Sequence, residues 1–205
     1  MSETITWALH GFLGLPSDWE GFNVKAVPIE AFSDMYTWAK HFNEQAKQEG
    51  AKKNRLIGYS MGGRLASYAA AQAPELWERV WLISTHPGLN SGFEGRIEKD
   101  EVWANKFENQ EWFSLMAEWM AQPVFFGSSA PLRMPSDFDR KTLVAYLRNY
   151  SLGRQKITPP DNVGWIVGEK DEIYRELLPK ALVIKDAGHR VMFDNPKALK
   201  LLCEI

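Results

Sequence analysis

Short runs of β-branched and apolar residues alternate along this chain with segments whose apolar residues recur at helical spacing. This alternation is typical of a parallel sheet, because parallel strands need long crossover connections that are usually helices. Strands are expected at residues 4–9, 24–29, 55–59, 80–84, 163–167 and 182–184. We therefore predict one α/β domain over residues 1–205, with about six parallel strands in the spatial order 2-1-3-4-5-6 and helices on both faces of the sheet.

Capping residues mark several of the intervening helices. Ser33 is expected to begin one helix and Gly50 to end it, because a hydroxyl can accept from the free N–H groups of a first turn and glycine readily adopts the left-handed conformation. A second helix is expected over residues 61–73. A last helix is expected from near Pro196, since proline suits the first helical turn.

The interval from about residue 90 to about residue 150 breaks the alternation. Its aromatic and methionine residues recur at helical spacing, with charged residues between them, and core packing is the simplest explanation for each one. An insertion of this length between two strands of one sheet is nevertheless informative. We expect it to form a helical cap over the ends of the strands.

The composition supports a folded domain and argues against one class of partner. Of 205 residues, 45% are hydrophobic and 13% are aromatic, so a sizeable core can form. The formal net charge is −2, and the short basic cluster from Lys52 to Arg55 fits a solvated approach to a strand. Nucleic acid is therefore not expected as a partner, and the sequence leaves the oligomeric state open.

Cys203 is the single cysteine of the sequence, which excludes an intrachain disulfide and a thiol-rich metal site. The first residues lack the basic and long apolar regions of a signal peptide, and no segment approaches the ~18 apolar residues of a membrane span. These features predict a cytoplasmic protein with no membrane partner.

The segment Gly58-Tyr59-Ser60-Met61-Gly62 joins an expected strand to an expected helix. It fits the pattern G-x-S-x-G, in which a strained turn exposes the serine hydroxyl at the carboxyl edge of a sheet and the glycines avoid clashes in the bend. The helix that follows places partial positive charge where an oxyanion would form. Ser60 is therefore interpreted as the nucleophile or the catalytic base.

A catalytic serine needs a base, and the base needs an orienting carboxylate. In this architecture the chain order is serine, acid, histidine, and Asp171 and His189 follow the fifth and sixth expected strands in that order. Asp171 could instead cap a short helix, His189 could be a surface-loop residue, and Asp186 is an alternative acid. Chain order and strand-end position together favour a triad of Ser60, His189 and Asp171.

Two backbone N–H groups are expected to form an oxyanion hole. One belongs to Met61, the residue after the serine, and the other to Phe12 in the turn after the first strand. His10, in the same turn, is expected to have a structural role. Because His10, His86 and His189 lack the spacing of metal ligands, no metal site and no cofactor are expected.

Arg64 lies four residues after Ser60, and so on the same face of the expected helix one turn further on. A salt bridge to a nearby carboxylate would explain an arginine at this position. A bidentate contact with a substrate carboxylate would explain it equally well. Both interpretations remain open at this point.

Over essentially its whole length the sequence resembles the α/β-hydrolase superfamily. Within that superfamily it resembles the 2-succinyl-6-hydroxy-2,4-cyclohexadiene-1-carboxylate synthases of menaquinone biosynthesis. The matching segments are HGFLG from His10, GYSMGGRLA from Gly58, HPGL from His86, QPVF from Gln122 and AGH ending at His189. HPGL and QPVF are more specific to this family than the serine turn, which many esterases share.

The resemblance implies an α/β-hydrolase fold and an enzyme that eliminates pyruvate from an enolpyruvyl side chain. In that family the triad is thought to start the reaction by proton abstraction, without an acyl-enzyme. The positions that match family substrate contacts are Tyr59, Arg64, Arg96 and Trp119, and Arg133 matches a third arginine at a shifted spacing.

Three segments differ from the family pattern. Ile173 stands shortly after the triad aspartate, where a basic residue is usual, and Met192 replaces a second histidine after AGH. Residues 27–34 replace a turn of the DLPGHG type. These differences concern the substrate rather than the triad.

Three functions follow from these observations. The first is a triad lyase of this family acting on a small anionic substrate. The alternative is a serine carboxylesterase acting on a small or carrier-linked ester, which a purely apolar cap would favour. The third is a ligand-binding protein without catalysis on the same fold, against which the complete triad argues.

Overall fold

The computed structural model describes residues 3–129 and 131–205 and contains a six-stranded sheet in which neighbouring strands are parallel. The spatial order is β2-β1-β3-β4-β5-β6, which confirms the predicted order. The strands are β1 (Thr4–Leu9), β2 (Lys25–Val27), β3 (Lys53–Tyr59), β4 (Trp77–Ile83), β5 (Gly164–Gly168) and β6 (Leu182–Ile184). The predicted bounds are right for β1 and β6, whereas β2 is shorter than predicted and β3 and β4 begin earlier.

The α-helices are α1 (Met35–Glu49), α2 (Met61–Gln72), α3 (Phe93–Asn109), α4 (Trp112–Met120), α5 (Arg140–Asn149), α6 (Glu172–Leu177), α7 (Val191–Asp194) and α8 (Pro196–Cys203). Gly50 ends α1 with a φ of 70°, as predicted. The prediction that Ser33 caps α1 is wrong. Asp34 is the cap, because its carboxylate accepts from the Thr37 N–H at 2.7 Å, and the Ser33 hydroxyl donates to that carboxylate. Across the described residues, no helix combines the length and apolar character needed to cross a membrane.

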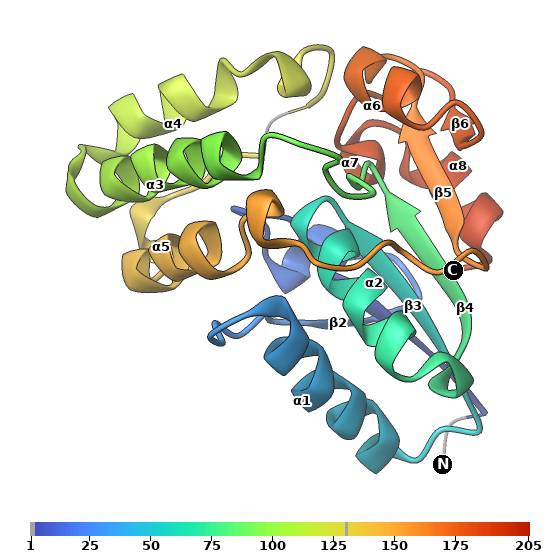
Figure 1. The fold of residues 1–205 in the computed structure, drawn as a ribbon. Helices are drawn as coiled ribbons and strands as arrows, with labels where there is room; N and C mark the ends of the chain where they lie inside the picture. Colours follow the sequence, from blue (N-terminus) through green and yellow to red (C-terminus); the bar gives the residue numbers. More distant parts are fainter. Residues whose placement is uncertain (1–2, 130) are drawn as a thin grey trace.

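Each strand sends alternate side chains to opposite faces of the sheet, and both faces are buried. On β3, Leu56 belongs to one hydrophobic cluster, whereas Ile57 and Tyr59 belong to a second. Helices α1 and α2 cover the first cluster, and α7, α8 and the 3-10 turn Pro16–Trp19 cover the second. Helices therefore lie on both faces of the sheet, as predicted (Figure 1).

Helices α1 and α2 are joined by one buried polar side chain as well as by apolar packing. Asn43 on α1 donates its amide to the Ala69 carbonyl oxygen of α2 at 3.0 Å and accepts from the indole N–H of Trp77 on β4 at 3.0 Å. The neighbouring ring of Phe42 stacks against Trp38 and Trp77 at centroid distances of 4.8 and 5.5 Å. These contacts fix the position of α2 against the sheet.

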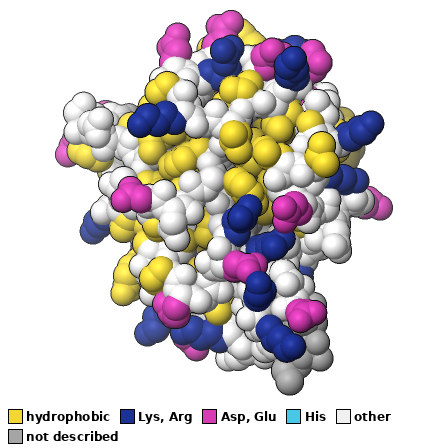
Figure 2. Space-filling view, turned by 90° about the vertical axis from the view of Figure 1, so that its right-hand side faces the viewer, with side chains coloured by type: hydrophobic (Ala, Val, Ile, Leu, Met, Phe, Trp, Pro, Cys, Tyr) yellow, Lys and Arg dark blue, Asp and Glu magenta, His cyan; other side chains and the backbone are white. Residues whose placement is uncertain are grey.

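The strand β6 forms one edge of the sheet and is three residues long. Exposed hydrophobic residues of this strand and of the adjacent α6 and α8 include Leu177, Leu182, Val183 and Leu201. Figure 2 faces the side of the molecule that carries these elements, and hydrophobic side chains gather near its centre with charges of both signs around them. A short edge strand surrounded by charges is a poor template for pairing with another chain.

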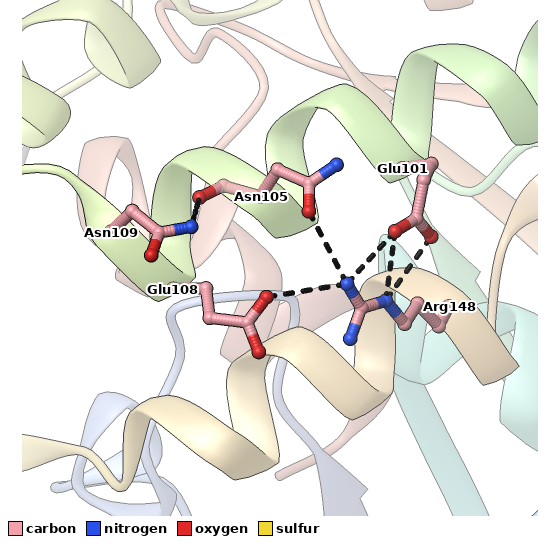
Figure 3. A network of polar contacts seen from close by, with 5 residues as sticks. All are labelled: Glu101, Asn105, Glu108, Asn109 and Arg148. Atoms are coloured by element: carbon pink, nitrogen blue, oxygen red, sulfur yellow. Dashed lines mark hydrogen bonds and ion pairs between the residues drawn. The ribbon is translucent and has the colours of Figure 1, made fainter.

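Helices α3, α4 and α5 all fall between β4 and β5 in the sequence and lie together outside the sheet (Figure 1). Arg148 of α5 forms ion pairs with Glu101 at 2.8 Å and Glu108 at 3.4 Å, both on α3 (Figure 3). Phe107 of α3 and Leu115 of α4 are fully buried in the same cluster that underlies α1 and α2. The insertion therefore shares its core with the sheet.

The loop after β2 anchors α5 to the rest of the chain. The Tyr146 hydroxyl donates to the Ile29 carbonyl oxygen. The Tyr150 hydroxyl donates to the Glu30 carbonyl oxygen and accepts from the Phe32 N–H, both at 2.7 Å. Residues of the loop after β2 thus hold the end of the helical insertion.

We predict that Asn43→Ala lowers the free energy of unfolding by about 1–3 kcal/mol. The change leaves the Trp77 indole N–H buried without a partner, which costs about that much, whereas the Ala69 carbonyl oxygen keeps its bond from the Ala73 N–H at 3.2 Å. Urea denaturation followed by circular dichroism measures the effect. Gln48→Ala, on the exposed side of the same helix, is the control and should shift the value by less than about 0.5 kcal/mol. Equal values for the two variants would contradict the role given to Asn43.

Candidate active site

Ser60 lies on a strained turn between β3 and α2. Its φ is 52° and its ψ is −112°, a combination that residues other than glycine rarely adopt. The Ser60 N–H donates to the Ile83 carbonyl oxygen at 2.9 Å, and the Ser60 carbonyl oxygen accepts from the N–H groups of Gly63 and Arg64. These bonds hold the serine at the end of β3.

Two glycines permit this turn because there is no room for a side chain. A Cβ atom on Gly62 would lie 2.3 Å from the His10 carbonyl oxygen, and one on Gly58 would lie 2.5 Å from the Gly62 carbonyl oxygen. Backbone atoms cannot swing away as the end of a flexible side chain can. Helix α2 can therefore begin directly against the ends of β1 and β3.

Ser60, His189 and Asp171 form one chain of hydrogen bonds. The His189 Nδ1 atom lies 2.8 Å from Asp171 Oδ2, and the His189 Nε2 atom lies 3.4 Å from Ser60 Oγ. Because a carboxylate can only accept, Nδ1 carries the proton and Nε2 is left to accept from the serine hydroxyl. The structure thus brings together the three residues that were predicted to form a triad.

Aromatic rings surround the His189 imidazole. The ring centroids of Tyr174, Tyr59 and Phe125 lie 4.8, 5.5 and 5.8 Å from that of His189. His189 and Asp171 are 2% and 3% exposed. Hydrogen bonds are electrostatically stronger in such a low-dielectric environment than in water, so the imidazole is held firmly in one orientation.

Asp171 also caps α6. Its Oδ1 atom accepts from the Tyr174 N–H at 3.4 Å, while Oδ2 lies against His189. The helix-cap and triad interpretations of this residue are therefore compatible, because one oxygen serves each. His189 is not a surface-loop residue, since it is buried, and the alternative acid Asp186 is exposed, with its backbone N–H bonded to Glu169.

A cavity of about 400 Å³ lies beside Ser60 and His189. Phe12 and Met61, which were predicted to supply the N–H groups of an oxyanion hole, both line it. Met61 is the first residue of α2, so its N–H has no partner within the helix. The volume is in the range of sites for small molecules.

Arg64 lines this cavity and is buried without an acidic partner. It is 9% exposed, and its Nη1 atom donates to the Tyr150 carbonyl oxygen at 2.6 Å. Burial, and then the nearby charge of Arg96, lower its pKa to about 10. No carboxylate of residues 3–129 or 131–205 pairs with it, so the salt bridge considered from the sequence is not formed. Asp100 acts on Arg64 only at longer range and opposes this lowering of its pKa. A buried guanidinium without a directly paired carboxylate favours an anionic ligand.

Two further cations line the cavity from α3. Arg96 donates through Nε to both oxygens of Asp100, at 2.9 and 3.0 Å, and Lys99 lies beside this pair. Asp100 offsets part of the Arg96 charge. Among the described lining residues, three basic side chains are thus present against one carboxylate, and such an excess of positive charge attracts anions.

Of the other predicted contact residues, Trp119 lines the cavity, whereas Tyr59 and Arg133 do not. Trp119 of α4 lines the cavity, with its ring 4.7 Å from that of Phe12. Tyr59 is buried beside His189 and does not line this cavity. Arg133 does not line it either, because its guanidinium is held by Asp18 at 2.6 Å.

His10 and His86 are held neutral near the site. Burial lowers the pKa of His10, and burial followed by the charge of Arg64 lowers the pKa of His86 to about 4. The His10 Nδ1–H donates to the Gly11 carbonyl oxygen at 2.8 Å, and the His86 Nδ1 accepts from the Gly88 N–H at 3.1 Å. In the part of the chain that the structure describes, no group of three or more His, Cys, Asp and Glu side chains is arranged to hold a metal ion.

Further residues line the cavity that were not predicted to be site residues. His86, Lys99 and Tyr174 all line the cavity. Lys99 follows Arg96 by three residues on a helix, and Tyr174 follows Asp171 by three, so helical spacing is a signal that could have indicated both. From the sequence, His86 was considered only as a metal ligand, which its spacing argued against, and as part of the HPGL segment.

Comparisons by sequence point to one family. A family model described as alpha/beta hydrolase fold matches residues 8–125. A protein of Escherichia coli O1:K1 / APEC, named 2-succinyl-6-hydroxy-2,4-cyclohexadiene-1-carboxylate synthase, is 34% identical over 163 residues, which are 69% of this chain and 63% of that protein. A protein of the same name from Salmonella typhimurium is 28% identical and aligns with 92% of this chain and 87% of its own length. The chain therefore spans less than two thirds of the E. coli relative that it matches.

Solved structures share the fold at low sequence identity. A structure described as MenH from S. aureus gives a TM-score of 0.83 at 18% identity and covers 100% of this chain and 93% of that chain. A marine microorganism esterase gives a TM-score of 0.63 at 17% identity and covers 100% of this chain and 95% of that chain. These likenesses concern the arrangement of helices and strands.

We predict that His86 makes the protein less stable as the pH falls from about 6.5 to 4. In the unfolded chain a histidine takes up its proton near pH 6.5, whereas folded His86 does so near 4, so acid favours the unfolded state. After allowance for partial exposure, this group accounts for roughly 1–3 kcal/mol of the loss. His86→Gln should reduce the difference in urea stability between pH 7 and pH 4.5 by that amount. His41→Gln, at an exposed histidine of α1, should leave the difference unchanged, and an equal effect of both variants would contradict the prediction.

Proposed function

This chain belongs to the α/β-hydrolase family, and from that premise we propose that it eliminates pyruvate from an enolpyruvyl precursor to give 2-succinyl-6-hydroxy-2,4-cyclohexadiene-1-carboxylate. The names of its sequence relatives support this reaction. The proposal assigns the chain to menaquinone biosynthesis in the cytoplasm, as an enzyme without a cofactor. Residues 1–205 act in it as a single domain, with α3 to α5 as a cap over the site.

The observation that carries the proposal is the unpaired charge of Arg64 beside the triad. Arg64 stands one helical turn from Ser60, is buried, and has no carboxylate partner among the described residues. Arg96 and Lys99 add positive charge to the same cavity. The substrate of this reaction carries several carboxylates, and a guanidinium recognises a carboxylate with two parallel hydrogen bonds.

The triad acts in this proposal as a unit that removes a proton. His189 Nε2 accepts the Ser60 hydroxyl proton while Asp171 holds the imidazole in place, and the serine oxygen takes a proton from the substrate carbon beside the succinyl carbonyl. The electron pair left on that carbon forms a double bond within the ring, and the bond between the ring and the enolpyruvyl oxygen breaks. The leaving group departs as the enolate of pyruvate, which the proton on His189 converts to pyruvate.

The oxyanion hole stabilises the charge that this step creates. Proton removal beside a carbonyl places negative charge on the carbonyl oxygen. The backbone N–H groups of Met61 and Phe12 are the donors for that oxygen in the proposal, and both residues line the cavity. Loss of one such donor typically lowers the rate about 10²- to 10³-fold.

A serine carboxylesterase is the second candidate. Two observations favour it: the cavity wall contains several aromatic side chains, among them Trp103, Trp119 and Phe125, and the Arg96 charge is already paired with Asp100. In that reaction Ser60 attacks an ester carbonyl and forms an acyl-enzyme, with the same groups as base and oxyanion hole.

The decisive experiment assays the purified protein on both substrates side by side. The lyase proposal expects release of pyruvate from the enolpyruvyl precursor and formation of the cyclohexadiene product. Its kcat/KM should exceed that for a neutral p-nitrophenyl ester. Turnover of the ester without turnover of the enolpyruvyl precursor would contradict the lyase proposal and support the esterase.

We predict that Ser60→Ala lowers kcat at least about 1,000-fold on the preferred substrate, because it removes the group that transfers the proton. Ser67→Ala is the matched control. Ser67 is a buried serine of the same helix that donates to the Gly63 carbonyl oxygen at 2.9 Å and does not line the cavity. Steady-state rates of both variants should separate catalysis from folding. Retention of full activity by Ser60→Ala would mean that the chain binds and converts its ligand elsewhere.

We predict that Arg64→Ala and Arg96→Ala each lower kcat/KM for the enolpyruvyl substrate about 10- to 150-fold. A charge-assisted contact with a carboxylate contributes about 1.5–3 kcal/mol, which corresponds to that range. The neutral ester, assayed with the same variants, should lose much less. Equal losses on both substrates would show that these arginines support the structure rather than bind anions.

A further inference from the structure

A second, smaller cavity adjoins Ser60 on the side of Tyr59. Its volume is about 60 Å³, and it shares Phe12, Ser60, Trp119 and Phe125 with the larger cavity. At about 10–15 Å³ for one water site, this space suits the few heavy atoms of a carboxylate group. Ser60 therefore stands where two cavities of different size meet.

Arg190 lines the small cavity and follows His189 directly in the chain. It is 6% exposed, and its guanidinium donates to the Ser129 carbonyl oxygen at 3.2 Å and contacts Met120 Sδ at 2.9 Å. It also lies over the Phe125 ring, 4.1 Å from the centroid. These contacts use two of its five N–H groups.

The charge of Arg190 has no direct counter-charge among residues 3–129 and 131–205. Asp18, which also lines the small cavity, is already paired with Arg133 at 2.6 Å. Asp194, nearby, accepts instead from the Ser128 hydroxyl and from the N–H groups of Ser129 and Gly188. Both carboxylates act on Arg190 at longer range, and burial lowers the pKa of its guanidinium.

We propose that Arg190 and the small cavity bind the carboxylate of the leaving group, a short 2-oxo or enol acid of three carbons. This assignment rests on the proposed elimination of pyruvate. It places the breaking C–O bond beside Ser60, the ring with its own carboxylates on the side of Arg64 and Arg96, and the leaving acid on the side of Arg190.

The arrangement accounts for two separate buried guanidinium groups around one serine. Arg64 and Arg190 line different cavities, and neither pairs with a carboxylate of the described residues. A substrate with anionic groups at both ends, held across Ser60, would satisfy both charges at once. A neutral ester would satisfy neither, so the second guanidinium adds selectivity for a substrate with an acidic leaving group.

Binding of pyruvate tests the proposal without any turnover. The probe is methionine methyl NMR, because Met120 lines the small cavity and Met61 lines the large one. Titration with pyruvate should shift the Met120 signal more than the Met61 signal. Pyruvamide, the neutral analogue, should bind at least about 10-fold more weakly, since it lacks the charge.

Arg190→Gln should weaken pyruvate binding about 10- to 150-fold. Arg79→Gln is the matched control, at an arginine of β4 that lines neither cavity and lies over Trp81, and it should bind pyruvate as the unchanged protein does. Equal affinity for pyruvate and pyruvamide, unchanged binding by Arg190→Gln, or a shift confined to Met61 would each overturn the proposal. If Arg190→Gln does not fold, the Met120 shift and the pyruvamide comparison in the unchanged protein decide the question.

The two proposals can fail separately. Pyruvate binding at Met120 without turnover of the enolpyruvyl substrate would end the lyase assignment and leave a site for a short carboxylate. Turnover of that substrate with no response at Met120 and no effect of Arg190→Gln would leave the lyase and end the role of Arg190.

Discussion

The close approach of the start of α2 to the ends of β1 and β3 is the constraint on which the site depends. At Gly62 and Gly58 a Cβ atom would lie 2.3 and 2.5 Å from backbone oxygens, so the helix can sit there only while both positions lack side chains. This contact holds Ser60 at a φ of 52°. It also sets where the next turn of α2 stands, and so carries Arg64 into the cavity wall. One packing contact between backbones thereby positions both the Ser60 hydroxyl and the Arg64 guanidinium.

Much of the fold follows from local patterns and general rules of topology. The bounds of β1 and β6, the end of α1 at Gly50 and the strand order were all predicted, because each depends on residues close in sequence or on the handedness of crossovers. The meeting of Ser60, Asp171 and His189 was predicted for a related reason. Parallel strands bring their carboxyl ends to one edge of the sheet, so residues just beyond those ends become neighbours.

The partners of the arginines could not be predicted from the sequence in the same way. Arg133 pairs with Asp18, which lies 115 residues away, and Arg64 meets the carbonyl of Tyr150 at the end of the helical insertion. Spacing along one helix says which face a side chain occupies, but not which distant loop or helix packs on that face. The same limit hid Arg190, whose environment is built from the segment around Ser129 and from Met120 of α4. Predicting such contacts requires the packing of the insertion against the sheet.

The two oxygens of Asp171 link the order of α6 to the state of His189. One oxygen holds the first turn of α6 through the Tyr174 N–H, and the other holds the imidazole, on which the Tyr174 ring also packs. A ligand that draws the imidazole toward Ser60 therefore pulls on the same carboxylate that keeps the helix start ordered. The Tyr174 amide becomes a spectroscopic reporter of the triad, because its chemical shift and its hydrogen exchange respond to events at a side chain on a different loop.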